Sequence, residues 1–208
     1  MKPVFFSSKP YIALLVVISA ALFSFSSNNH NSVSLATSKI ACLAGKAEMS
    51  LDTASPPMVS HAVAMLSGTY ADTTVSGTVK FDAKSNGKVK MTLTISIPAK
   101  AGKSVAVHIH EHGDCGDMGK MAHGHWNPTK AQHGKWGSAS FHLGDIGNVK
   151  LNAKGKGTLT LITDLWSLGG SPDKNILGKS IIVHGGVDDY TTQPTGNAGT
   201  RIGCGVIR

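Results

Sequence analysis

Residues 91–97 read Met-Thr-Leu-Thr-Ile-Ser-Ile, and this alternation of apolar and hydroxyl side chains decides the fold class. Successive side chains of a strand point to opposite faces, so the pattern predicts a strand with one buried face. Asn86-Gly87, just before this segment, is a turn signal typical of a β-hairpin. The same alternation recurs, in longer or shorter form, at residues 75–81, 105–109, 159–161, 181–183 and 204–206.

Short strands separated by turn residues, without a helical period, predict an all-β sandwich or barrel. Two long stretches, residues 111–141 and 187–202, lack the strand pattern. Long loops inside a compact domain are usually functional. Most of the histidines fall in or beside these two stretches, which are therefore the first place to look for a site.

The beginning of the chain has a different composition. Two lysines precede a mostly apolar run from Tyr11 to Phe25, which predicts a secretory signal peptide over residues 1–27. An uncleaved membrane anchor is the alternative, but a spanning helix needs about 20 apolar residues. Residues 28–58 are rich in Ser, Asn, Thr and Ala and predict a flexible linker, which leaves residues 59–208 as the folded domain.

The net charge of the chain is +8, and loss of Lys2 and Lys9 with a signal peptide would leave +6. The lysines of the domain are scattered singly, without a basic run and without interleaved aromatic residues. This pattern predicts no nucleic-acid partner. It indicates either an ordinary solvated surface or a mild attraction for small anions.

The chain has three cysteines, Cys42, Cys115 and Cys204. In an exported protein a widely spaced pair predicts a disulfide, because that compartment does not reduce it. Cys115 and Cys204 lie inside the folded region, so we expect these two to pair. Acylation of Cys42 is a minor alternative that would tether the chain to a membrane, but Cys42 lies 17 residues beyond Phe25.

The histidine pattern begins in the strand predicted at residues 105–109. His108 and His110 are two residues apart, so on a strand their side chains lie on one face about 6.6 Å apart. The alternating apolar residues Val105, Val107 and Ile109 take the core side, which turns both imidazoles outward. On another predicted strand, Ile181 and Val183 face the core, so the side chain of His184 also faces outward. Outward imidazoles at this spacing can share one metal ion.

The first long loop adds more ligand-type residues, and seven histidines fall within the 35 residues that begin at His108. Imidazole suits copper and zinc, and one carboxylate completes a zinc site well. The density therefore predicts metal binding. The additional residues are His112, His123, His125, His133, His142 and Asp145.

Six separated runs of the sequence together form a recognisable pattern. They are His108-Ile-His-Glu-His-Gly-Asp-Cys115, Gly124-His-Trp-Asn-Pro128, His133-Gly134, His142-Leu-Gly-Asp-Ile-Gly-Asn148, Val183-His184 and Gly196-Asn-Ala-Gly-Thr-Arg-Ile-Gly-Cys-Gly205. These runs resemble the copper/zinc superoxide dismutases, and the resemblance covers about residues 59–208. It implies an eight-stranded Greek-key β-barrel, related to the immunoglobulin-like sandwich, with two long functional loops and the metals outside the barrel.

The resemblance also implies the ligand sets of two ions that share one imidazole. Asp188 matches a carboxylate that links a copper ligand to a zinc ligand, and Arg201 matches the arginine beside copper that holds the anion. Cys115 and Cys204 match the family's disulfide, whereas His112 and His123 have no ligand role in the family pattern. The implied copper ligands are His108, His110, His125 and His184, and the implied zinc ligands are His125, His133, His142 and Asp145.

The function that the resemblance implies is dismutation of superoxide to dioxygen and hydrogen peroxide. Copper, bridged to zinc through His125, would be alternately reduced and oxidised, with Arg201 and His125 as the catalytic residues. A non-catalytic copper-binding or copper-handling module on the same fold is the alternative. The short spacing between His110 and Cys115 resembles exported bacterial members and favours a periplasmic or secreted enzyme. A homodimer remains an option, and membrane contact is expected only through the signal peptide or a tether.

Overall fold

The structure, a computed structural model, describes residues 55–208. The predicted signal peptide and most of the predicted linker lie outside the described residues. At the start of the described part, the Gly170 N–H donates to the Pro56 carbonyl (2.8 Å) and the Val59 N–H donates to the Leu168 carbonyl (2.8 Å). The end of the predicted linker therefore lies along residues 168–170.

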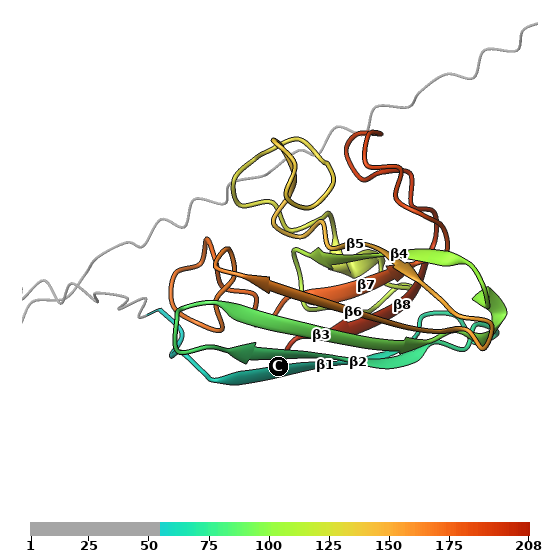
Figure 1. The fold of residues 1–208 in the computed structure, drawn as a ribbon, viewed down its shortest axis with the longest axis horizontal. Helices are drawn as coiled ribbons and strands as arrows, with labels where there is room; N and C mark the ends of the chain where they lie inside the picture. Colours follow the sequence, from blue (N-terminus) through green and yellow to red (C-terminus); the bar gives the residue numbers. More distant parts are fainter. Residues whose placement is uncertain (1–54) are drawn as a thin grey trace, which may run out of the picture. The chain divides into compact units, whose positions relative to one another are not determined.

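The described residues form one sheet of eight antiparallel strands and two short 3-10 helices (Figure 1). Over residues 55–208, no helix has the length and apolar character needed to cross a bilayer. The strands are β1 (His61–Gly68), β2 (Ser76–Ala83), β3 (Val89–Ser96), β4 (Ser104–His110), β5 (Gly147–Lys150), β6 (Lys156–Thr163), β7 (Ser180–His184) and β8 (Arg201–Val206), and the 3-10 helices are η1 (Pro98–Lys100) and η2 (Lys120–Ala122).

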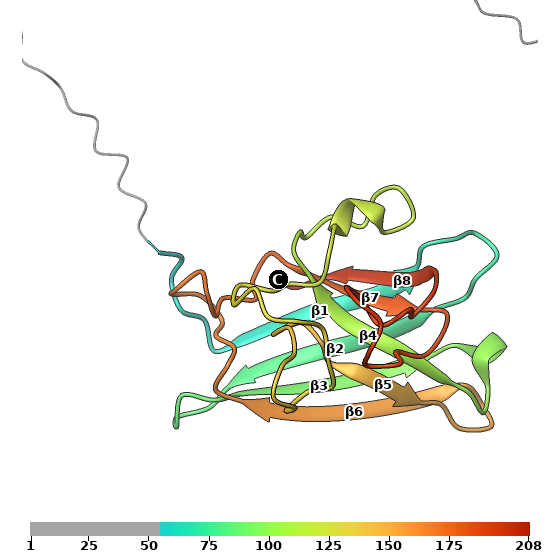
Figure 2. The same cartoon turned by 90° about the horizontal axis from the view of Figure 1, so that it is seen from above.

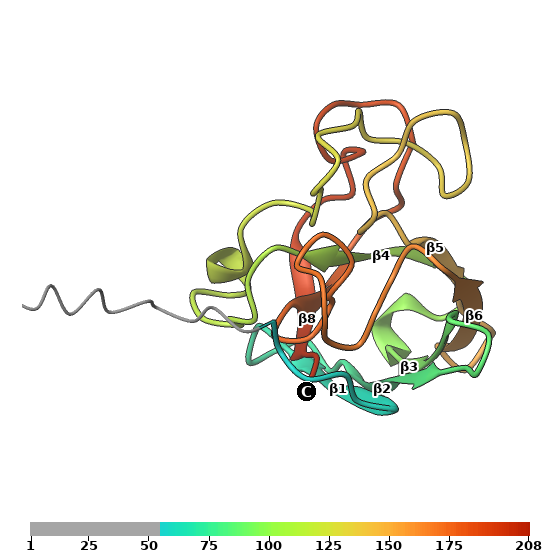
Figure 3. The ribbon, with the colours of Figure 1, turned by 90° about the vertical axis from the view of Figure 1, so that its left-hand side faces the viewer.

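The sheet curls into a nearly closed barrel. Its strand order is β5-β4-β7-β8-β1-β2-β3-β6, and the two end strands β5 and β6 come together on one side (Figure 3). Neighbours in this order are often distant in the chain, because the connections after β3 and β6 cross from one side of the barrel to the other. This is a Greek-key arrangement, and the predicted all-β fold is confirmed.

The alternating stretch that opened the sequence is β3, and its apolar residues fill the barrel. Met91 and Leu93 lie opposite Phe81 and Val79 of β2, and all four side chains are fully buried. Each such side chain stabilises the fold by about 1.5–3 kcal/mol relative to an exposed one. The predicted Asn86-Gly87 turn joins these strands, with Gly87 at φ +77°. Figure 2 shows the hairpin beside the rest of the sheet.

Two long connections project on the same side of the barrel, beyond β4 (Figures 1 and 3). The first, residues 111–146, joins β4 to β5, and the second, residues 185–200, joins β7 to β8. The predicted ranges were close but not correct at every end. The first loop continues past residue 141 to the start of β5, and β8 begins at Arg201 instead of after residue 202. Both boundaries follow from main-chain pairing, which a side-chain pattern does not register.

A disulfide joins Cys115 to Cys204, and this predicted pair is confirmed. Cys204 is on β8, whereas Cys115 belongs to the first loop. Around the disulfide, Ala122 and Ile182 form a small buried cluster with Cys204, outside the barrel core. The covalent bond and this cluster together hold the beginning of the first loop against β7 and β8.

Candidate metal centre

Strands β4 and β7 present three histidines on their outer faces. Their neighbours Ile109 and Val183 point into the barrel core, so the imidazoles of His108, His110 and His184 leave the core on the opposite side, as predicted. These rings are nevertheless buried, with exposures of 0%, 0% and 5%, because the two long loops cover them.

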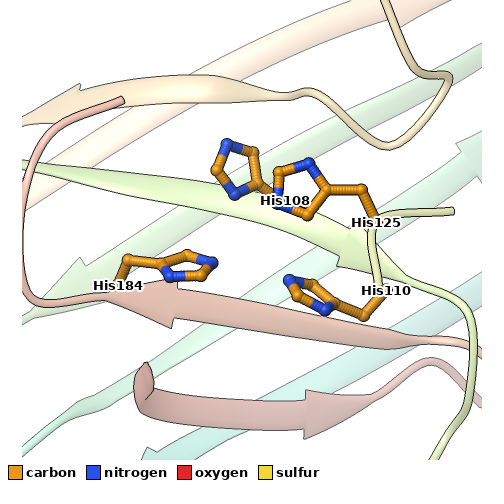
Figure 4. A group of neighbouring side chains, drawn as sticks. All are labelled: His108, His110, His125 and His184. Atoms are coloured by element: carbon orange, nitrogen blue, oxygen red, sulfur yellow. The ribbon is translucent and has the colours of Figure 1, made fainter. Parts of the chain in front are cut away.

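His125 joins this group from the first loop. It reaches the end of β4 through an antiparallel bridge to His110. Figure 4 shows His108, His110, His125 and His184 turned toward one another over β4 and β7. The six distances between their ring centroids run from 4.0 to 6.4 Å. One ring nitrogen from each lies within 4.8 Å of the others, a spacing that one metal ion can fill.

A second buried cluster adjoins the first through the same His125. The Nδ1 atoms of His125, His133 and His142 lie 2.8, 3.0 and 3.2 Å from the carboxylate oxygens of Asp145. Ligand atoms about 2.0–2.1 Å from a tetrahedral zinc ion would lie roughly 3.3 Å from one another. The cluster therefore has nearly the size and composition of a three-imidazole, one-carboxylate zinc site.

Six buried ring nitrogens have no hydrogen-bond partner within the described residues. Buried polar atoms are normally satisfied, so a convergent set without partners needs a reason. Each belongs to one of the two clusters, and each faces the interior of its cluster. Imidazole nitrogens with free lone pairs suit copper and zinc, so the donor set fits these metals. The atoms are His108 Nδ1, His110 Nε2, His125 Nε2, His133 Nδ1, His142 Nδ1 and His184 Nε2.

Asp188, in the loop after β7, bridges the two clusters. Its Oδ2 accepts a hydrogen bond from His108 Nε2 (2.9 Å), and its Oδ1 accepts one from His133 Nε2 (2.9 Å). Donation at Nε2 leaves the Nδ1 lone pair of each ring free and aims it into its cluster. The Tyr190 N–H also donates to Oδ1 (2.7 Å), which fixes the carboxylate in its turn.

Two further contacts hold the second long loop, one to strand β5 and one to the first long loop, and the sequence did not single them out. Asn148 exchanges two hydrogen bonds with the backbone of Asp188, each 2.8 Å. Gln193 does the same with the backbone of His133, at 2.9 Å each. Asn148 is the last residue of one of the runs that resemble the family, so the sequence could have identified it as a candidate. Gln193 lies in none of these runs, and no sequence pattern pointed to it. These contacts hold the bridging carboxylate and a cluster histidine in place.

Arg201 begins β8 and is paired with His184 of β7 in the ladder. Its Nη1 donates to the Gly119 carbonyl and its Nη2 to the His123 carbonyl, both at 2.6 Å. The same His123 carbonyl accepts a hydrogen bond from His110 Nδ1 (2.9 Å). The guanidinium is thus held beside the first cluster, with three of its five N–H groups free of partners in residues 55–208.

Burial sets the protonation of the clusters. It lowers the pKa of His125 to about 4 and that of His184 to about 3, and neighbouring imidazoles contribute. Burial would raise the pKa of Asp145, but hydrogen bonds from the His125 ring and from the backbone N–H groups of His142 and Gly134 outweigh it and keep that pKa far below the ordinary value. Near neutral pH His125 and His184 are therefore neutral and Asp145 is ionised, and these are the forms that bind metal.

His112 and His123, the two histidines without a predicted ligand role, stand apart from both clusters. They lie on the exposed surface of the first loop with Glu111, which the sequence did not single out. The fold and the clusters together define a Greek-key barrel with two adjoining clusters, built from six histidines and one aspartate, that could each hold a metal ion.

Comparison with known proteins identifies the family. Residues 75–207 match the sequence profile of the family described as copper/zinc superoxide dismutase. A superoxide dismutase [Cu-Zn] of Yarrowia lipolytica is 39% identical over 153 residues, which cover 70% of this chain and 96% of that protein. An extracellular superoxide dismutase [Cu-Zn] of Caenorhabditis elegans is 38% identical over 141 residues, which cover 65% of this chain and 62% of that protein.

Solved structures agree with the fold. The clock protein EA4 is 32% identical, with a TM-score of 0.63 over 73% of this chain and 95% of its own. A double mutant of a SOD-like protein from Bacillus subtilis is 30% identical, with a TM-score of 0.61 over 69% of this chain and 95% of its own. The chain belongs to the copper/zinc superoxide dismutase family, whose enzymes use copper and zinc as cofactors.

Proposed function

We propose that this chain converts two superoxide anions and two protons into one dioxygen and one hydrogen peroxide. Family membership supports the activity, since several relatives 33–39% identical are named superoxide dismutases. The observation that carries the proposal is the set of six buried, unpartnered imidazole nitrogens that converge in two adjoining clusters. A barrel that had lost metal chemistry would not keep such a set unsatisfied.

The two clusters differ in composition, and this difference supports the assignment of the ions. Four imidazoles without a carboxylate suit copper, whereas three imidazoles with one carboxylate suit zinc. The shared His125 can offer Nε2 to one ion and Nδ1 to the other. We assign copper to His108, His110, His125 and His184, and zinc to His125, His133, His142 and Asp145.

Copper, when bound, supplies the one-electron oxidation and reduction of superoxide, whereas zinc has no redox chemistry. The residues around the clusters do the remaining work. Arg201 binds the anion through its free N–H groups, beside the histidines of the first cluster. His125 holds and releases a proton at Nε2, and Asp188 keeps the rings of His108 and His133 in their ligating orientation.

One purified sample can test the activity and the alternative together. Metal content is measured by mass spectrometry, and superoxide decay is followed on the same preparation. We expect about one copper and one zinc per chain, with catalytic removal of superoxide above that of an equal amount of free copper. A fully loaded sample with no such activity would support a copper-binding or copper-handling module instead.

We also propose that the protein is exported to the periplasm or secreted. The basic and apolar start of the chain and the disulfide support this location. The C. elegans relative named above as extracellular is compatible with it. Cell fractionation with sequencing of the mature N-terminus tests the proposal. A product that stays in the reducing cytoplasm with residues 1–27 intact would contradict it.

A further inference from the structure

A third set of ligand-type side chains lies outside the two clusters. Glu111, His112 and His123 each offer one ligand atom within 4.8 Å of the other two. All three side chains are exposed, and the two imidazole centroids are 4.4 Å apart. Neither cluster of the metal centre includes any of these residues.

Backbone pairing brings these residues together. The bridge between His110 and His125 continues outward, since the Glu111 N–H donates to the Gly124 carbonyl (3.1 Å) and the His112 N–H to the Ala122 carbonyl (3.2 Å). The second of these bonds is shifted by one residue from the pairing of the bridge, and together the two bonds hold residues 111–112 alongside residues 122–124. The backbone thus brings the rings of His112 and His123 near each other.

His123 has an unusual backbone conformation, with φ +61°. A non-glycine residue in this region costs about 1–3 kcal/mol, and such residues gather at functional sites. Glycine at this position would remove the strain but also the imidazole. The position thus keeps a side chain that its own backbone disfavours.

The ligand atoms of the set are available. Within residues 55–208, His112 and His123 form hydrogen bonds through backbone atoms only. By contrast, the exposed His61 is paired through Nδ1 with Asp82 (2.8 Å). Two free imidazoles and one carboxylate are a donor set that zinc accepts in proteins, with water completing the coordination.

We propose that Glu111, His112 and His123 form a third metal site, which takes one divalent ion of the zinc or copper type. Its three protein ligands and open exposure make it an exchangeable site, filled and emptied with the metal supply. The site is also linked to the metal centre. The His123 carbonyl is the acceptor shared by His110 Nδ1 and Arg201 Nη2, so an ion on the His123 ring restrains the residue that holds both groups.

The binding test uses the full chain already loaded with one copper and one zinc. Zinc is titrated into this protein by calorimetry, and bound metal is counted after desalting. We expect one further zinc per chain, with affinity reduced at least roughly tenfold in Glu111→Gln and in His112→Asn. His61→Asn is the matched control, an exposed histidine that should leave the third ion in place. No third ion, or one that persists unchanged in His112→Asn, would overturn the site.

The link to the metal centre, which rests on the proposed function, has a separate readout. The electron paramagnetic resonance spectrum of copper(II) should shift when the third zinc binds to the wild type, and should stay constant in His112→Asn. A third ion that leaves the copper spectrum unchanged would overturn the link. A loaded wild type without dismutase activity that still binds the third zinc would refute the proposed function and not the site.

Discussion

Replacement of the bridging carboxylate, Asp188→Asn, should weaken copper binding more than zinc binding. In the native protein Oδ1 accepts hydrogen bonds from His133 Nε2 and the Tyr190 N–H, while Oδ2 accepts one from His108 Nε2. An asparagine has one carbonyl oxygen. If the asparagine oxygen takes the place of Oδ1, it still accepts the hydrogen bonds from His133 Nε2 and the Tyr190 N–H. The NH₂ group of the asparagine then takes the place of Oδ2 and faces the ring of His108.

The magnitude follows from this lost acceptor. His108 must either leave its Nε2–H unsatisfied or move the proton to Nδ1, the atom that faces the first cluster. A hydrogen bond to a charged acceptor contributes about 1.5–3 kcal/mol, which corresponds to roughly 10- to 150-fold in affinity. His133 retains its acceptor. We therefore expect copper affinity to fall by one to two orders of magnitude and zinc affinity by less.

The assay is a competition titration of the metal-free protein against a chromophoric chelator, once with copper and once with zinc. Asp189→Asn is the matched control, because it removes the same charge from the adjacent position. Asp189 is exposed, and its carboxylate accepts hydrogen bonds from Thr191 and Thr192 but from no cluster histidine. Zinc affinity reduced as much as copper affinity, or an equal effect of the control, would refute the reasoning.

Four other perturbations have distinct outcomes. Replacing both Cys115 and Cys204 by Ala should lower the free energy of unfolding, measured by urea titration, by up to about 4.6 kcal/mol, because the disulfide spans 89 residues and limits the conformational entropy of the unfolded chain. A change below about 1 kcal/mol would contradict this entropic explanation. Arg201→Ala should slow superoxide removal at least about tenfold with full metal content, and equal loss of copper would show a structural role. His133→Asn should remove zinc and leave copper bound, because only His125 is shared, so parallel loss of both metals would refute the two-ion assignment. The metal-free protein should lose stability as the pH falls from 6.5 toward about 4, because the His125 imidazole takes up a proton in this range in the unfolded chain but not in the folded one. A urea midpoint that stays constant across this pH range would contradict this expectation.

Much of the fold could be read from single residues and their spacing. The alternation around Met91 and Leu93 predicted a buried strand face, and Asn86-Gly87 predicted its hairpin. These signals are local, since a strand's period and a turn's φ requirement act over a few residues. Strand β1, at His61–Gly68, was not identified as a separate strand, and its exposed Val63 and Met65 blur the alternation.

The sequence by itself determined which chemistry was available. Seven histidines within 35 residues, with Asp145 three residues after the last, predict a metal site because few other uses require so many imidazoles. His108 and His110 could be placed on one strand face by period alone. The order of the motifs indicated the family before any contact was known.

Only the tertiary structure decided how these residues meet. Asp188 reaches His108 and His133 over separations of 80 and 55 residues, and the His123 carbonyl holds Arg201 from 78 residues away. The burial that lowers the pKa of His125 and His184 likewise comes from loops folded over β4 and β7. Such contacts depend on loop paths around the closed barrel, and no local pattern encodes them, because each hydrogen bond joins atoms whose proximity is set by the whole chain.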